Sequence, residues 1–202
     1  PRTDRLVDEE LYTFGTNPCS EIILRSREFC NLSEVVVRSE DKIKDIGRKV
    51  KFATMLGTLQ STLTNFKYLP KEWLNNCKEE RLLGVSLTGI MDNSLTNGKS
   101  KSKTYPIDNL LQDLRQIAVD TNKEWSEKLG IPQSTAITCV KPSGTVSQLV
   151  DAASGIHARH NPYYIRTVRG DKKDPLTKMM TDIGFPVEDD LMNPSHTAVF
   201  SF

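Results

Sequence analysis

The chain has 202 residues, and 27 lysine and arginine residues nearly balance 26 aspartate and glutamate residues, so that the formal net charge is +1. This length suits one domain of ordinary size, and the balanced charge provides no global field that would favour nucleic acid or an acidic partner. No apolar run is long enough to span a membrane and no secretory signal pattern is present, so we expect neither a membrane nor a nucleic-acid partner.

Four cysteines bear on the redox compartment: Cys19, Cys30, Cys77 and Cys139. They are enough for two disulfides, but without a secretory signal reduced thiols are expected, and we predict a cytoplasmic protein. No Cys-x-x-Cys pair or Cys/His cluster has the spacing of zinc ligands, so we expect no metal site among these residues.

The first motif occupies residues 17–22 and reads Asn-Pro-Cys-Ser-Glu-Ile, and Cys30 follows eleven residues after its cysteine. In an extended segment, side chains two positions apart project to the same side. We therefore expect Asn17, Cys19 and Glu21 to share a face. Together these side chains offer a reactive sulfur, an amide that donates and accepts hydrogen bonds, and a base, which predicts a catalytic site.

Residues 22–24 are a short apolar run, and the β-branched run at residues 35–37 predicts a buried strand. Cys30 lies near the start of the second run. A cysteine in such a place is often a small buried hydrophobe, so at this point Cys30 is either a core residue or a reactive thiol.

Apolar residues recur at steps of three and four between residues 41 and 66, which predicts a helix that faces the core. Cys77 lies in the polar stretch that follows, and we expect it to be exposed. Residues 81–92 then predict a second strand and its exit turn, where glycines indicate close backbone approach.

Residues 93–105 are rich in serine, asparagine, glycine and lysine and predict a surface loop. A helix is expected from Asp108 to about Leu129. The sequence Gly-Ile-Pro at residues 130–132 ends it with a glycine cap and a proline stop.

Residues 134–140 alternate threonine and aliphatic residues, which predicts a third strand with Cys139 in the core. The strand leads into a glycine-containing, hydroxyl-rich turn at residues 141–148 and then into an apolar segment. Backbone N–H groups and hydroxyls at such a turn can hold a phosphate, although the same residues also make an ordinary helix N-cap. The candidate phosphate-binding residues are Pro142, Ser143, Gly144, Thr145, Val146 and Ser147.

A loop around Gly155 is expected at residues 151–160, followed by a strand-like segment with Tyr163 and Tyr164 half-buried. The remainder of the chain is charged and proline-containing. It predicts one short helix at about residues 176–183 and a strand at residues 199–202.

Two motifs together resemble those of a known family. The Asn-Pro-Cys-x-Glu-Ile sequence with Cys30 resembles the active-site finger loop of ribonucleotide reductases. The sequence Lys-Pro-Ser-Gly-Thr-Val-Ser at residues 141–147, with the Gly-Ile-His segment that follows, resembles the phosphate-binding region of the adenosylcobalamin-dependent (class II) members. The likeness runs from about Thr16 to about Arg169, and the monomeric ribonucleoside-triphosphate reductases of bacteria and phages are the most similar type.

The resemblance implies an α/β fold in which residues 1–202 are a single partial domain, part of the ten-stranded α/β barrel of ribonucleotide reductases. Within it, the finger loop is expected at residues 16–24 and the phosphate-binding turn at residues 141–148. The chain begins without methionine and family members are several times longer, so we expect an internal fragment that is inactive alone.

The resemblance also implies roles for residues. Cys19 would carry the thiyl radical, Glu21 would act as general base, Asn17 would orient the ribose, and Cys30 would be one thiol of the reducing pair, whose partner lies upstream of this chain. The substrate would be a ribonucleoside triphosphate, the cofactor adenosylcobalamin, and the reductant thioredoxin or a similar dithiol. A deoxynucleoside triphosphate effector would act through parts outside this fragment.

Three alternatives stay open. The first is the large subunit of a di-iron-dependent (class I) ribonucleoside-diphosphate reductase. The second is a phosphate-binding module without catalysis. The third is a hydrolase with Cys19 as nucleophile, which needs a histidine base from among His157, His160 and His196.

Overall fold

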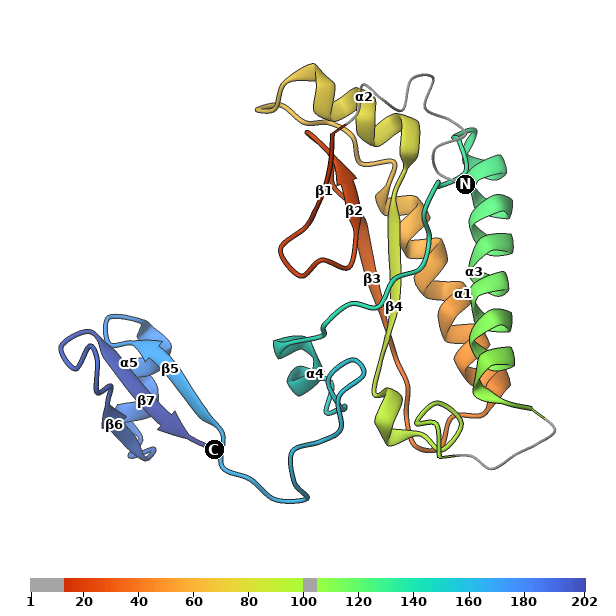
Figure 1. Cartoon of the computed structure of the whole chain (residues 1–202). Helices are drawn as coiled ribbons and strands as arrows, with labels where there is room; N and C mark the ends of the chain where they lie inside the picture. The colour runs from red at the N-terminus through yellow and green to blue at the C-terminus, as the bar shows by residue number, and fades with distance from the viewer. Residues whose placement is uncertain (1–12, 100–104) are drawn as a thin grey trace. The chain divides into compact units, whose positions relative to one another are not determined.

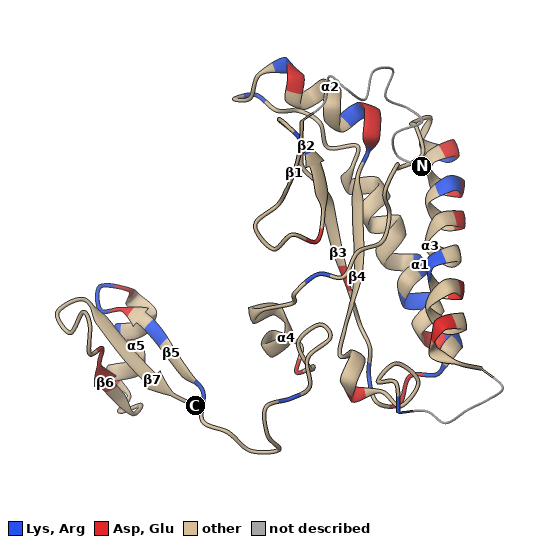
Figure 2. Ribbon diagram, viewed as in Figure 1, with Lys and Arg blue, Asp and Glu red and all other residues tan. Residues whose placement is uncertain are grey.

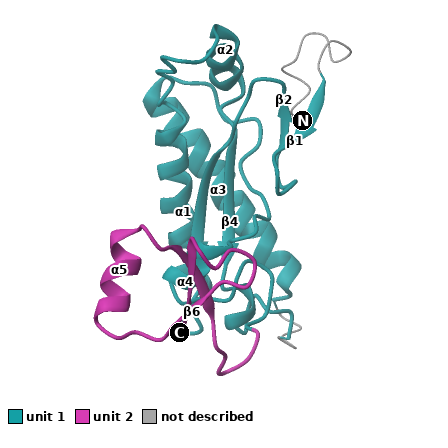
Figure 3. Cartoon of the chain, turned by 90° about the vertical axis from the view of Figure 1, so that its left-hand side faces the viewer, with its two compact units in different colours: residues 1–159 teal, residues 160–202 magenta. Residues whose placement is uncertain are grey.

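The computed structural model describes residues 13–99 and 105–202. Contacts within the chain group it into two compact units, residues 1–159 and residues 160–202, which are coloured separately in Figure 3. Each unit is described by itself below. That the whole chain is a single partial domain stays a prediction.

The first unit is built around two parallel strands, β3 (Asn31–Val36) and β4 (Leu83–Thr88). Three helices accompany them in Figure 1: α1 (Ile43–Gln60), α2 (Lys71–Glu80) and α3 (Ile107–Leu129). The predicted α/β character and the two long helices are confirmed, and the strand predicted at residues 35–37 is present as β3, which starts earlier and ends at Val36. Among the described residues, none of the helices has both the length and the apolar character that a membrane crossing needs.

One face of the parallel pair packs against α1, which in turn packs against α3. Side chains alternate along a strand, so the odd-numbered residues of β3 and β4 face these helices. The buried apolar core consists of Val35, Val37, Ile46, Val50, Ala53, Leu83, Val85, Leu110, Leu114, Ala118 and Ile137. The side of α3 away from the core carries charges of both signs (Figure 2), including the pair Glu124–Lys128 at 2.5 Å.

The opposite face of the two strands carries the even-numbered side chains, and we call it the inner face. It consists of Cys30, Leu32 and Glu34 from the β3 side and Gly84, Ser86 and Thr88 from β4. It is the face from which a site can be built, because the other face is filled by the helices.

The predicted third strand is present only as a short pairing with β4. Val85 and Thr138 form a parallel bridge, and the Cys139 N–H donates to the Val85 carbonyl at 3.0 Å. This pairing still places the end of the segment, and the turn after it, beside the carboxyl end of β4.

Two short strands, β1 (Phe14–Thr16) and β2 (Ile23–Arg25), form an antiparallel hairpin with Thr16 opposite Ile23. α3 ends as predicted at Gly130, which adopts the left-handed conformation with φ of 63°. A short helix, η3 (Ile90–Asp92), follows β4. The predicted surface loop at residues 93–105 falls partly outside the described residues.

The second unit is a three-stranded antiparallel sheet with one helix. The strand order is β5 (Thr167–Asp171), β7 (Thr197–Ser201), β6 (Val187–Asp189), with α5 (Pro175–Asp182) between β5 and β6 in sequence. The predicted helix near residues 176–183 and the strand at the end are confirmed.

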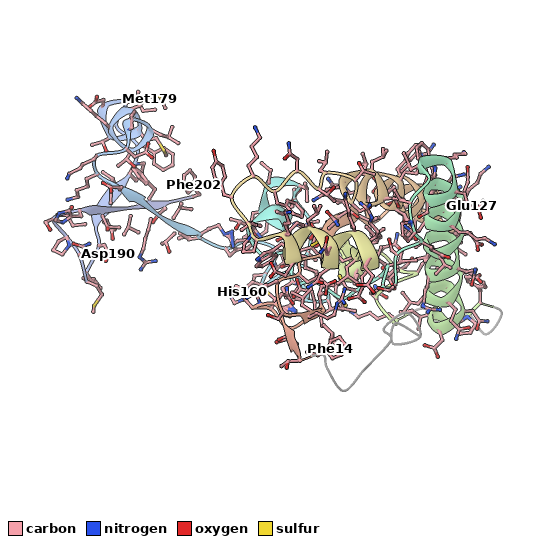
Figure 4. All side chains as sticks on the ribbon, turned by 90° about the horizontal axis from the view of Figure 1, so that it is seen from above. Phe14, Glu127, His160, Met179, Asp190 and Phe202 are labelled. Carbon is pink, nitrogen blue, oxygen red and sulfur yellow. The ribbon has the colours of Figure 1, made fainter. Side chains whose placement is uncertain are left out.

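Three aromatic rings gather in the second unit, and of these Phe200 is buried. The ring of Phe185 lies 6.0 Å from that of Phe200 and 4.9 Å from that of Phe202. Figure 4 labels Met179, which lies half exposed on α5. The prediction of a half-buried strand at Tyr163 and Tyr164 is wrong, because Tyr163 is 93% exposed and both residues precede β5.

Candidate active site

Residues 17–22 are the loop of the β1–β2 hairpin. The Ser20 N–H donates to the Asn17 carbonyl at 2.9 Å, and the Ile22 N–H donates to Asn17 Oδ1 at 3.0 Å. Ser20 has a φ of 60°. The segment is therefore a turn closed by the Asn17 side chain, and the expectation of an extended segment is wrong. Strand alternation does not place Asn17, Cys19 and Glu21 on one face.

The two reactive side chains of this loop have different surroundings. Cys19 is exposed at the tip of the hairpin. Glu21 is half-buried, and its Oε2 atom is buried without a hydrogen-bond partner. An unsatisfied buried oxygen costs free energy, so such atoms call for an explanation. The Glu21 carboxylate thus lies inward of the exposed Cys19 at the tip of the same loop.

Cys30 and Cys139 approach one another on the inner face beside Gly84. A Cβ atom at Gly84 would lie 3.2 Å from Cys30 Sγ, 3.1 Å from Cys139 Sγ and 2.4 Å from Leu32 Cδ2. Neighbouring side chains therefore lie close to the backbone at Gly84, as the glycine in this strand predicted. Cys139 was expected in the core, but it is half-buried next to Cys30.

The same place receives the Glu21 carboxylate. Burial, and secondarily the negative charge of Glu21, raises the pKa of the Cys139 thiol to about 11. A carboxylate acts on a thiol in this way only at short range, so Glu21 lies near Cys139. The hairpin loop, the start of β3 and the third strand thus bring one carboxylate and two thiols together.

Cys77 does not belong to this group. It was expected to be exposed, but it is buried on α2 with 7% of its surface accessible. Its polar neighbours in sequence face solvent while the helix turns the sulfur inward. Burial raises the pKa of this thiol also.

These surroundings predict an order of thiol alkylation. With iodoacetamide at pH 8, Cys19 should react first, because it is exposed and the thiolate is the attacking form. Cys139, with a pKa of about 11, has roughly one thiolate in a thousand at that pH. Its rate should rise about tenfold per pH unit until the pH nears its pKa.

Peptide mapping by mass spectrometry over a pH series measures this order. A Cys19→Ser variant serves as control, since it removes the fast site and should leave the slow ones unchanged. Fast, pH-independent labelling of Cys139 below pH 9 would contradict the described environment.

The candidate phosphate turn, residues 141–148, leads from the third strand into a helix, and its second half already belongs to that helix, α4 (Thr145–Leu149). Gly144 has φ of 58° and ψ of −130°, a conformation that favours glycine. Ser143 Oγ donates to Glu34 Oε1 at 2.8 Å, and Ser147 Oγ donates to the Gly144 carbonyl at 2.6 Å. Both serine hydroxyl protons are thus used inside the protein. The groups left for a phosphate are the first N–H groups of α4 and the Thr145 hydroxyl.

The loop after α4 is anchored to the carboxyl end of β4. Thr88 Oγ1 accepts from the Gly155 N–H at 2.8 Å and donates to the Ala153 carbonyl at 2.9 Å. A Cβ atom at Gly155 would lie 3.2 Å from the Lys141 carbonyl. The loop and the phosphate turn therefore pack together at the carboxyl ends of parallel strands, where open α/β sheets bind their ligands.

An ion pair that sequence reasoning missed anchors the hairpin. Arg25, the last residue of β2, places Nε 2.8 Å from Glu80 Oε2, and these side chains are 2% and 0% exposed. The Arg25 N–H also donates to Glu28 Oε2 at 2.9 Å. The pair joins the hairpin to the end of α2. The only sequence signal was an arginine directly after an apolar strand.

Known proteins resemble this chain in sequence and in structure. No protein-family model matches the chain. The chain is 32% identical over 211 residues to an adenosylcobalamin-dependent ribonucleoside-triphosphate reductase of Lactobacillus gasseri. The aligned region covers 93% of this chain and 28% of that protein. It is 31% identical over 191 residues to the enzyme of that name from Euglena gracilis, covering 93% of this chain and 25% of that protein.

A solved structure also matches. A B-12 dependent (class II) ribonucleotide reductase superposes with a TM-score of 0.68 at 27% identity, over 93% of this chain and 29% of that chain. The chain thus spans about a quarter of the length of the relatives it matches. The predicted fold, part of the α/β barrel of this family, is confirmed by the superposition.

Proposed function

Because this chain is a relative of the adenosylcobalamin-dependent ribonucleotide reductases along nine-tenths of its length, we propose that it is the catalytic segment of such an enzyme. The reaction is the reduction of ribonucleoside triphosphates to 2′-deoxyribonucleotides. The observation that carries the proposal is this similarity, together with a hairpin loop that presents the exposed Cys19 two residues before the Glu21 carboxylate.

In this proposal Cys19 is the radical-carrying thiol. Its sulfur removes the 3′-hydrogen of the ribose and returns it at the end of the reaction. Glu21 accepts the proton of the 3′-hydroxyl, since a carboxylate within hydrogen-bond reach can act as general base. The Asn17 side chain uses its oxygen on Ile22, so its amide N–H groups are what remain to hold a ribose hydroxyl.

Cys30 supplies one of the two thiols that are oxidised. The 2′-hydroxyl leaves as water after protonation, and the two thiols end as a disulfide, which balances the two electrons given to the ribose. We place the partner of Cys30 outside this chain. Thioredoxin or a similar dithiol then restores the pair, and a deoxynucleoside triphosphate effector acts through other parts of the protein.

The turn of residues 142–147 holds the substrate phosphates through backbone N–H groups and the Thr145 hydroxyl. α4 is only five residues long, so the amides themselves contribute more than a helix dipole. Fixing the phosphates fixes the ribose relative to Cys19, and positioning of this kind lowers the barrier without any new chemistry.

The cofactor of the proposal is adenosylcobalamin. The exposed tip of the hairpin fits it, because a thiol that receives a radical from a separate group has to be reachable. When bound, the cofactor supplies the radical that Cys19 carries. Cys19 is the residue of this chain that we place against it.

The test is an assay of the full-length protein with a ribonucleoside triphosphate, a dithiol, and either adenosylcobalamin or iron with a second subunit. Deoxynucleotide formation is expected only with adenosylcobalamin. Activity that ignores cobalamin and needs iron would move the protein to class I, and no activity in either system would favour a phosphate-binding module.

A further inference from the structure

Glu34 contacts the phosphate turn from a distant part of the sequence. Its Oε1 atom accepts the Ser143 hydroxyl at 2.8 Å across 109 positions of the chain. Ser143 is 4% exposed, so little water competes for this hydrogen bond. A hydrogen bond to a charged group in such surroundings is among the stronger ones.

Glu34 also belongs to the strand that carries the reducing thiol. It lies four residues after Cys30, and both are on the inner face. At about 3.3 Å per residue, the two positions are roughly 13 Å apart along the strand. Strand β3 is paired with β4 over its whole length, so this separation is fixed by the sheet.

The Ser143–Glu34 hydrogen bond therefore holds the phosphate turn against strand β3, whose position is fixed by its pairing with β4. A second tie acts on the other side of the turn, where Gly155 packs against the Lys141 carbonyl and is itself bonded to Thr88 of β4. Between these two contacts the turn is held by both central strands.

We propose that Glu34 is a positioning residue for the nucleotide: through Ser143, it sets the place of the phosphate turn relative to Cys30. The inference rests on the proposed function for the identity of the nucleotide. Glu34 itself contacts no phosphate, since its carboxylate would repel one. Ser143 gives its proton to Glu34, and so serves by placing the backbone of the turn.

The test uses the full-length protein with Glu34→Ala, Glu34→Gln, Ser143→Ala and the double variant Glu34→Ala/Ser143→Ala. KM and kcat for a ribonucleoside triphosphate are measured, together with equilibrium binding of ATP without cobalamin. Glu34→Ala should raise KM and the dissociation constant about tenfold or more. Glu34→Gln should recover most of the loss, because its amide oxygen still accepts a hydrogen bond.

Non-additivity is the decisive result. If Glu34 acts through Ser143, the double variant should be no worse than Ser143→Ala alone. Ser33→Ala is the matched control. Ser33 is the residue before Glu34 on β3, and its side chain lies on the opposite face of the strand, close to Gly57 of α1. Its buried Oγ has no hydrogen-bond partner. It should change neither constant, and melting temperatures show whether any variant is merely unfolded.

Additive effects of Glu34 and Ser143, or an unchanged KM and ATP affinity in Glu34→Ala, would overturn the inference. If Glu34→Ala fails to fold, Glu34→Gln is compared with Ser143→Ala instead. An equal rise in KM and in the ATP dissociation constant in these two variants would refute the inference. A protein that binds ATP in the expected pattern but makes no deoxynucleotide would refute the proposed function and keep this inference. A protein that neither binds ATP nor reacts would refute both.

Discussion

Replacing Cys19 with serine is expected to abolish deoxynucleotide formation in the cobalamin-dependent assay, with a loss on the order of a thousandfold or more. The serine hydroxyl has nearly the same size and the same exposed place at the tip of the hairpin. It cannot serve as radical carrier, because an alcohol O–H bond is much stronger than a thiol S–H bond. The fold should be unaffected, since an exposed side chain contributes little to stability.

Two controls make this result specific. Cys77→Ala removes a thiol from α2, outside the finger loop, and should keep activity close to the parent value. ATP affinity of Cys19→Ser should also match the parent, since the phosphate turn is untouched. Residual reduction above one-hundredth of the parent rate would show that Cys19 is not the radical carrier.

The regular elements of the first unit are largely predictable because local patterns dominate them. Steps of three and four residues predict α1, and the sequence Gly-Ile-Pro at residues 130–132 predicts the end of α3 at Gly130. The β-branched run before residue 37 predicts β3. In each case burial follows the pattern of the segment itself.

The candidate site is predictable only in part, because its geometry depends on contacts between distant segments. The motif residues 17–22 identify the reactive groups, but their spacing suggested an extended strand where Asn17 closes a turn. Cys77 lies in a polar stretch, and only the orientation of α2 shows that it is buried. No local pattern connects Glu34 with Ser143 or Cys30 with Cys139, because pairing in register creates those neighbours.

Loss of the Arg25–Glu80 pair is expected to have the largest effect on stability. Arg25→Ala should lower the free energy of unfolding by about 3–5 kcal/mol, because it leaves the fully buried Glu80 carboxylate without its main counter-charge. The hairpin is joined to α2 through this pair. Arg25→Ala should therefore also loosen the loop that carries Cys19, and limited proteolysis near residues 17–22 should become faster.

The chain provides a matched control two residues away. Arg27 pairs with Glu72 of the same helix at 3.2 Å, but these side chains are 54% and 55% exposed, so Arg27→Ala should cost at most about 1 kcal/mol. Replacing Arg25 and Glu80 together with methionine and leucine should cost less than Arg25→Ala, because the buried Glu80 carboxylate is then removed along with its counter-charge. Urea unfolding of the three variants measures the differences. Equal losses for Arg25→Ala and Arg27→Ala would mean that water reaches the Arg25 site, and that the Arg25–Glu80 pair contributes no more to stability than the exposed pair does.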